Sequence, residues 1–368
     1  MSLSHRVLGA PGQDNLLRVD VNAGTAIHRL QFDCGDRCLD ALAPGEIKAT
    51  EQLFFSHLHM DHVGGFDAFF RSNFERAGRP VTLWGPPGTA AILHHRFRGF
   101  WWNIVNDVPG TWIVHEVHAE RVESWRFEAR EAFASAHPLA PFEHGGTIVS
   151  APDFTVEAIA LSHHGVSLGY LVREAARSVI DRERLRASGL PSGPWLRELK
   201  ASAQEAGARN AREAAEEGRA GAVRADGARA GGAEAGGDRV EWIEIDGKRY
   251  AASTLREDLL IESPRGSIAY LTDFLLDEAT FERLVPRLAG IDTLVCESQY
   301  HPDDHRLAAR NHHATIDRVA ALAAASGVGT LVAFHLSERY ERGVMSEMLS
   351  LARERFPRTR YPAHWDIT

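Results

Sequence analysis

The sequence of 368 residues contains only three cysteines, Cys34, Cys38 and Cys296. They are too few and too unevenly placed for a disulfide framework, so we expect all three to be buried packing residues. No window approaches the ~20 consecutive apolar residues that a membrane span requires, and no charged segment followed by an apolar stretch opens the chain. These absences predict a soluble, cytoplasmic protein without a membrane partner.

Basic charge is also scarce, because 41 Lys and Arg against 50 Asp and Glu give a formal net charge of -9. Proteins gain affinity for nucleic acid largely by neutralising phosphates, so this balance argues against nucleic-acid binding by the surface as a whole. A local basic patch would still suffice, and metal ions bound to acidic and imidazole groups would return positive charge to a cleft. The segment 94–102 mixes cations and aromatic rings suited to stacking on a nucleotide, although packing of a helix explains such a segment more often.

Histidine, by contrast, is concentrated in one place. His57, His59, Asp61 and His62 lie within six consecutive positions directly after the apolar run Leu53-Phe54-Phe55. Side chains alternate along a strand, so His57 and His59 face the same side, and the turn that follows brings Asp61 and His62 towards the same cavity. Imidazole and carboxylate are the ligands that zinc accepts where thiolates are not used, and two-metal hydrolases hold their ions ~3.5–4 Å apart. The motif therefore predicts two metals and further ligands downstream.

Three later apolar segments meet this requirement, because each predicts a strand that ends at a ligand type. The segments 154–161, 267–272 and 330–334 lead to His163 with His164, to Asp273 and to His335, respectively. A lone His or Asp more often merely caps a strand. The cluster and its strand-end partners together favour a metal site over a scaffold that has lost its ion.

These residues resemble the metallo-β-lactamase superfamily, and within it the ribonuclease Z family. The resemblance is carried by His57-x-His59-x-Asp61-His62, by Leu83-Trp84-Gly85-Pro86-Pro87-Gly88, by the segment from His163 to Gly169-Tyr170, by His312-His313-Ala314-Thr315 and by Phe334-His335-Leu336-Ser337-Glu338-Arg339-Tyr340. It implies an α/β protein with the metallo-β-lactamase fold, a four-layer αββα sandwich forming a single domain over residues 1–368. It also implies an inserted flexible arm at 171–262.

The resemblance further implies the roles of individual residues. One zinc would be held by His57, His59 and His163, the other by Asp61, His62 and His335, with Asp273 bridging both; the adjacent His164 stays open as an alternative to His163. The catalytic residues would be Asp61, Glu297 and His313, the last two as a proton-transfer pair. The position of His313 before the amphipathic run 316–325 also fits a plain helix N-terminus. Imidazole suits zinc, so we expect two Zn²⁺ per chain, with Mn²⁺ or Co²⁺ as substitutes.

The function that the resemblance implies is phosphodiester hydrolysis, specifically removal of the 3′ trailer of precursor tRNA by a homodimer. Gly193 and Pro194 would lie at the tip of the arm and contact the tRNA, although a proline-rich tip is also a common way to end a hairpin. The tract 201–238 is rich in Ala, Gly, Arg and Glu, and we expect it to be disordered or a fraying helix. The segment 240–251 then predicts a returning hairpin.

The N-terminus departs from the family, because the segment 8–18 lacks the Gly-Thr-Gly start and the basic loop that contacts the tRNA 3′ end. Three functions therefore stay open: the endoribonuclease, a hydrolase of small esters, lactones or cyclic phosphodiesters on the same fold, and a metal-free RNA-binding relative. The intact ligand set argues against the third.

Overall fold

The computed structural model describes residues 3–24, 26–103, 107–175, 178–203, 241–262 and 265–368. The chain divides into two compact units, one formed by Met1–Ala175 with Gly266–Thr368 and the other by Ala176–Arg265. The first unit holds the two large sheets, and the second holds two small ones. Among the described residues, no helix has both the length and the apolar content that crossing a membrane requires.

The first sheet has eight strands in sequence order. They are β1 (Leu3–Leu8), β2 (Leu16–Asn22), β3 (Ile27–Phe32), β4 (Gln52–Phe54), β5 (Val81–Gly85), β6 (Thr111–Val117), β7 (Arg121–Glu128) and β8 (His137–Glu143). Strands β3 to β6 are parallel, and the connections between them carry α1 (Pro44–Lys48), α2 (Met60–Val63), α3 (Phe66–Asn73) and α4 (Thr89–Arg98). Leu53 and Phe54 of β4 are both buried, as expected for a central parallel strand covered on both faces.

The second sheet has seven strands in the order β19-β18-β17-β16-β11-β10-β9. They are β9 (Thr147–Ser150), β10 (Phe154–Ser162), β11 (Val166–Glu174), β16 (Ser267–Leu271), β17 (Thr293–Glu297), β18 (Thr330–Phe334) and β19 (Thr359–Arg360). Strands β16 to β19 are parallel, with α8 (Glu278–Leu288), α9 (His305–Arg310), α10 (Ile316–Ser326) and α11 (Arg342–Arg355) in the connections. β11 pairs with β16 directly, so the second unit is an insertion between two neighbouring strands.

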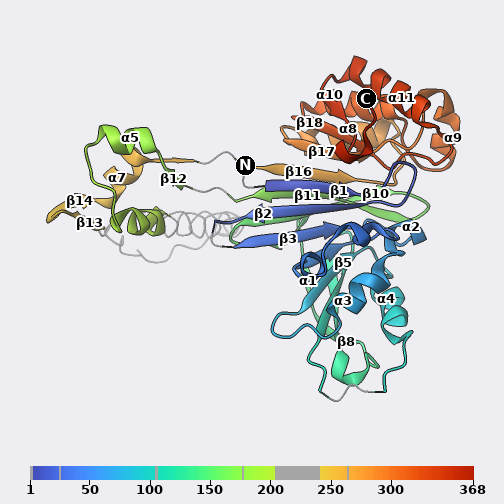
Figure 1. The fold of residues 1–368 in the computed structure, drawn as a ribbon, viewed down its shortest axis with the longest axis horizontal. Helices are drawn as coiled ribbons and strands as arrows, with labels where there is room; N and C mark the ends of the chain where they lie inside the picture. The colour runs from blue at the N-terminus through green and yellow to red at the C-terminus, as the bar shows by residue number, and fades with distance from the viewer. Residues whose placement is uncertain (1–2, 25, 104–106, 176–177, 204–240, 263–264) are drawn as a thin grey trace, which may run out of the picture. The chain divides into compact units, whose positions relative to one another are not determined.

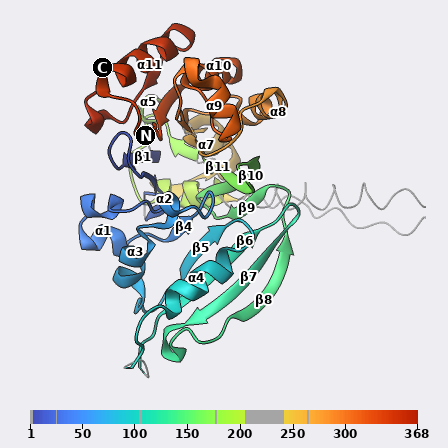
Figure 2. The same cartoon turned by 90° about the vertical axis from the view of Figure 1, so that its right-hand side faces the viewer.

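The first unit is a four-layer sandwich, because helices cover the outer face of each sheet. Figures 1 and 2 show α1, α3 and α4 on the first sheet, and α8, α10 and α11 on the second. Between the sheets, Phe32 and Phe54 stack with ring centroids 4.9 Å apart and contact Tyr170 of the opposite sheet. The Tyr170 hydroxyl donates to the Phe55 carbonyl, which joins the sheets beside the metal-ligand motif. The predicted αββα fold is thus confirmed.

Helix packing explains most of the aromatic segment 94–102. Phe97 is buried in α4, and the ring of Trp102 packs 5.2 Å from that of Phe133. Two rings are exposed, Phe100 by 47% and Trp101 by 88%. All three cysteines are buried and unpaired, as expected.

The second unit has its own small core. β12 (Ser178–Ile180) pairs with β15 (Leu260–Glu262), and β13 (Trp242–Ile245) pairs with β14 (Lys248–Ala251) through a turn at Asp246 and Gly247, both with positive φ. The described helices of this unit are α5 (Arg182–Ala187), α7 (Ala252–Leu259) and a helical segment at 195–203. The core is formed by side chains of the β13–β14 hairpin, α7 and the segment 195–203, and it includes Trp195, Leu199, Ile243, Ile245 and Leu255. Of the tract 201–238, residues 204–238 lie outside the described residues. Residues 171–174 belong to β11 of the first unit.

Candidate metal centre

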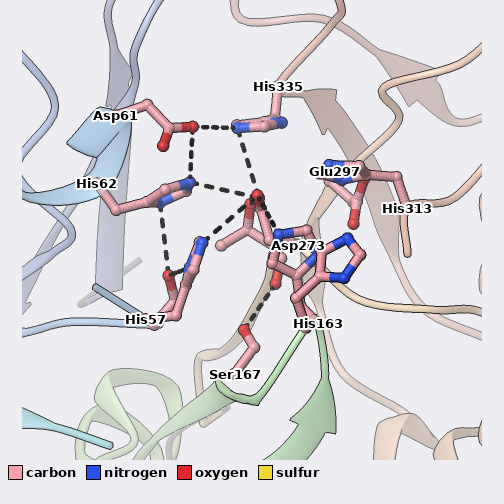
Figure 3. Close-up of polar contacts among 12 residues, drawn as sticks. His57, Asp61, His62, His163, Ser167, Asp273, Glu297, His313 and His335 are labelled. Carbon is pink, nitrogen blue, oxygen red and sulfur yellow. Dashed lines mark hydrogen bonds and ion pairs between the residues drawn. The ribbon is translucent and has the colours of Figure 1, made fainter. Parts of the chain in front are cut away.

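The structure brings the predicted ligands together at one end of the two sheets. Two groups of donors, each with ligand atoms within 4.8 Å of one another, hold the seven predicted ligands: His57, His59 and His163 form one, and Asp61, His62, Asp273 and His335 form the other. His57 and His59 follow β4, Asp61 and His62 lie in α2, and His163, Asp273 and His335 follow β10, β16 and β18. Figure 3 shows side chains from both sheets converging. His164 is not in either group, because its ring stacks on that of His312 at 4.4 Å.

Asp273, a member of the second group, lies between the histidines of the two groups. Its Oδ2 is 3.7 Å from Nε2 of both His57 and His163, and its Oδ1 is 3.4 Å from Nε2 of both His62 and His335. One carboxylate oxygen therefore faces each group. This is the arrangement that a bridging ligand requires.

The donor atoms fit a metal. Nε2 of His57 and Nε2 of His62 are buried and have no hydrogen-bond partner among the described residues. Burial, with the neighbouring His62, lowers the pKa of His57 to about 2, so this ring is neutral and has a lone pair to offer. Buried polar atoms rarely stay unpartnered, and imidazole with carboxylate is a donor set that divalent metals accept. The residues present therefore fit a metal centre.

In the second group, the pKa values of His335 and Asp273 depend on their interaction with each other and with Asp61 and His62. Burial lowers the pKa of His335, but the charge of Asp273 and a hydrogen bond to Asp61 outweigh it and raise the pKa to about 9. Burial likewise opposes ionisation of Asp273, yet His335 and His62 hold the pKa of that carboxyl well below its usual range. Without a metal, these shifts favour a protonated His335 beside an ionised Asp273. Binding of a metal would displace the proton from the ring.

Outer partners orient the buried rings. The Nδ1 contacts are His62 with Asp33 Oδ2 at 2.8 Å, His163 with the His312 carbonyl at 2.9 Å, His57 with Ser56 Oγ at 3.1 Å and His335 with Gln299 Nε2 at 3.3 Å. Because Nδ1 is held from outside, Nε2 is left to face the centre. Sequence analysis missed Asp33, Ser56 and Gln299 as partners. For Asp33 a signal existed, because it directly follows the strand β3, much as Asp273 follows β16.

Asp33 is a fully buried carboxylate with several donors. It accepts from the backbone N–H of Ser56 at 2.7 Å, from Ser56 Oγ at 2.8 Å and from the Tyr270 hydroxyl at 2.7 Å, besides its contact with His62. These donors come from the metal-ligand motif and from the opposite sheet. Asp33 therefore positions the motif and joins the two sheets.

We expect Asp33→Ala to lower the free energy of unfolding of the metal-free protein by about 3–5 kcal/mol, because it leaves several buried donors and a buried imidazole without their partner. Denaturant unfolding would measure this loss. Asp36→Ala, three residues later at an exposed position, is the matched control and should change the free energy of unfolding by less than about 1 kcal/mol. A loss for Asp33→Ala no larger than for the control would contradict this role.

The backbone around the centre is sharply turned. Asp33, His164, Asp273, His312 and His335 all have positive φ, between 45° and 58°. Non-glycine residues adopt this conformation at a cost of ~1–3 kcal/mol, and such residues gather at functional sites. Asp33 and His335 directly follow β3 and β18, and Asp273 is the second residue after β16, so in each case a turn at the strand end aims the side chain.

Glu297 and His313 form a pair beside both donor groups. The fully buried Glu297 contacts His313 Nδ1 through Oε2 at 2.9 Å and accepts from the backbone N–H of Phe274 through Oε1 at 2.7 Å. Burial lowers the pKa of His313, but the charge and hydrogen bond of Glu297 raise it above its usual value. The His313 ring is 4.7 Å from that of His163, so its geometry also admits it as a ligand. Because Nδ1 contacts Glu297, only Nε2 is left to act towards the centre.

The N-terminal segment 8–18, which departs from the family pattern, lies next to the block of residues 336–340 that follows His335. A Cβ built on Gly12 would come within 3.1 Å of Glu338 Cα, so the loop between β1 and β2 packs closely on this block. Arg339 lies over the ring of Tyr300 at 5.6 Å. The loop and Glu338 line a cavity of about 1600 Å³ in the first unit. The altered segment therefore packs directly on the residues that follow His335.

Comparison with known proteins identifies the family, although no family model matches the sequence. The chain is 44% identical to the Ribonuclease Z of Deinococcus radiodurans over 99% of this chain and 98% of that protein. It is 26% identical to the Ribonuclease Z of Listeria monocytogenes over 89% and 84% of the two chains. Its fold matches the metallo-β-lactamase fold protein YhfI from Bacillus subtilis with a TM-score of 0.52, at 11% identity and over 98% and 95% of the two chains. The protein is a metal-dependent hydrolase with the metallo-β-lactamase fold, and it belongs to the ribonuclease Z family.

Proposed function

We propose that this protein is a zinc-dependent endoribonuclease that removes the 3′ trailer of precursor tRNA. The observation that carries the proposal is the position of Asp273, with one carboxylate oxygen facing each donor group, beside the Glu297–His313 pair. A phosphodiesterase needs positive charge on two sides of the phosphate and an acid for the departing oxygen. Family membership supports RNA as the substrate.

The ligands divide between two ions in this proposal. One Zn²⁺ would be held by His57, His59 and His163, and the other by Asp61, His62 and His335, with Asp273 shared. The imidazole-rich donor set favours zinc, with Mn²⁺ or Co²⁺ as substitutes. When bound, the ions would neutralise charge on the phosphate oxygens and lower the pKa of an attacking water.

The remaining steps fall to side chains of this protein. His313 gives a proton from Nε2 to the departing ribose oxygen, while Glu297 stabilises the charged imidazolium through Nδ1. Burial opposes the charge of Asp61, but the neighbouring His335 and His62 hold its pKa well below its usual range, so it stays ionised. The Asp61 side chain is 42% exposed, and it can accept a hydrogen bond from the attacking water.

The inserted arm, proposed to span 171–262 within a single domain over 1–368, would bind the RNA. The second unit has a cavity of about 1010 Å³ lined by Gly193 and Pro194. Four cations also line it, Arg182, Arg186, Arg197 and Lys200, and among its described lining residues there is no Asp or Glu. In a chain with a net charge of -9, this is the kind of local basic patch that phosphate binding requires.

The double variant Arg186→Glu, Arg197→Glu is expected to raise KM for precursor tRNA by about tenfold, since repulsion replaces phosphate contacts. Turnover of bis(p-nitrophenyl) phosphate should stay unchanged, because all the metal donors and the Glu297–His313 pair belong to the first unit. Arg249→Glu is the control, since Arg249 is in the same unit but does not line this cavity. Equal losses on both substrates would count against the arm as the RNA site.

A homodimer and a cytoplasmic location belong to the proposal through the family resemblance. Sedimentation velocity of the full chain at micromolar concentration should therefore give the mass of two copies. A single species of 40.6 kDa would contradict the dimer.

Product mapping tests the proposed reaction. The zinc-loaded protein is incubated with a 3′-extended precursor tRNA, alongside a chelated sample and an unstructured RNA of matched length. Cleavage just after the discriminator base, lost on chelation and absent with the unstructured RNA, is the expected result. Intact precursor together with hydrolysis of a lactone or a cyclic phosphodiester would instead assign the centre to small substrates.

A further inference from the structure

The outer contact of His335 differs in kind from those of the other buried rings. His62, His163 and His57 place Nδ1 against a carboxylate, a backbone carbonyl and a hydroxyl, all of which can accept a hydrogen bond. His335 places Nδ1 3.3 Å from Nε2 of Gln299, an amide nitrogen that can only donate.

This contact has a chemical consequence for metal binding. A neutral imidazole carries one proton, so a ring that offers the Nε2 lone pair to a metal carries its proton on Nδ1. Nδ1–H and the Gln299 amide N–H would then be two donors facing each other. Conversely, if Nδ1 accepts from Gln299, a neutral ring has its proton on Nε2 and cannot bind a metal there.

Rotation of the amide resolves the conflict. The oxygen and nitrogen of a glutamine amide have nearly the same shape, so a half-turn about the last side-chain bond places Oε1 where Nε2 lies. The rest of Gln299 is held in place. Its carbonyl accepts from the Ser337 N–H at 3.1 Å, and the preceding Ser298 N–H donates to the Phe334 carbonyl at 2.8 Å. Both bonds tie the Gln299 segment to the segment that carries His335.

We propose that Gln299 is a positioning residue for the metal centre. In the metal-loaded protein its Oε1 accepts the Nδ1–H of His335, which holds the ring with Nε2 towards the ion. The inference rests on the ligand role of His335 in the proposed function.

Two substitutions of Gln299 test whether its side chain acts on His335 as a hydrogen-bond acceptor or as a donor. Gln299→Leu removes both hydrogen-bonding atoms and should weaken zinc binding 10–100-fold, the usual effect of losing such an outer partner. Gln299→Glu offers only an acceptor and should bind zinc within about threefold of wild type. Competition with a chromogenic chelator measures both affinities. Gln52→Leu is the control, because Gln52 is another half-buried glutamine, which accepts from the Trp84 indole N–H in the first sheet.

The outcomes distinguish this inference from the proposed function. Wild-type affinity in Gln299→Leu, or equal weakening in Gln299→Leu and Gln299→Glu, would overturn the role of Gln299. If His335→Ala itself leaves zinc binding unchanged, the ligand role of His335 fails and the inference fails with it. ¹⁵N NMR of the zinc-loaded wild type, with labelled histidine, needs no variant to fold: we expect the His335 proton on Nδ1, and a proton on Nε2 would refute the proposal.

Discussion

Replacing His313 with alanine is expected to slow cleavage of precursor tRNA by about 10²–10⁴-fold, the range that a general acid contributes. The departing ribose oxygen is strongly basic, so it leaves slowly unless it is protonated. Nitrophenolate leaves without a proton, and hydrolysis of bis(p-nitrophenyl) phosphate should therefore fall less than tenfold. Single-turnover rates on the two substrates would measure the difference.

The structure explains why His313 should show this selectivity. Glu297 raises its pKa and holds Nδ1, so a protonated ring presents Nε2 to the centre. His305→Ala is a matched control, because His305 lies at an exposed position in α9 and should leave both rates unchanged. Equal slowing of the two substrates by His313→Ala would remove the acid role and favour a role for His313 in holding the metal.

Replacing Asp273 with alanine is expected to abolish the metal centre. Each of its oxygens faces one donor group, so its loss removes a ligand from both ions and the negative charge that balances them. Metal ions contribute several kcal/mol to such reactions, which corresponds to about 10³-fold or more in rate. Both substrates should be affected alike, because the loss precedes any choice of leaving group.

Metal content after exhaustive dialysis tests this directly, with two ions expected per wild-type chain and at most one in Asp273→Ala. The control is Asp277→Ala, which removes the exposed N-cap of α8 four residues later. That variant should lose about 1 kcal/mol of stability and keep its metal. Full metal content in Asp273→Ala would refute the bridging role.

The local sequence was enough to predict which donor side chains gather at one place, and the family resemblance predicted the layered fold. His57, His59, Asp61 and His62 are close in sequence, and the period-two alternation of a strand already directs the first two to one side. Asp273 and His335 were found because a ligand type directly follows an apolar run. These signals depend on a few adjacent residues, which is why they can be recognised without knowing where the strands lie in space.

The partners that orient these ligands could not be predicted in the same way. Tyr270 donates to Asp33 across 237 positions, and His163 meets the carbonyl of His312 across 149. Such contacts depend on the packing of two sheets, and no period in the sequence encodes them. The choice between His163 and His164 has the same origin, because the positive φ of His164 and its stacking on His312 direct its ring away from the donors.

The sequence alone therefore specified which chemistry the chain can perform, because metal ligands are residue types at recognisable positions. The packing of the strands in the folded protein specified where the side chains that carry this chemistry lie relative to one another. Asp273 comes between the two donor groups only when β16 lies beside β11 in the second sheet, and Gln299 reaches His335 only because β17 and β18 are neighbours. Distances of a few ångströms between residues far apart in the chain are properties of the folded protein, since only the fold brings those residues together.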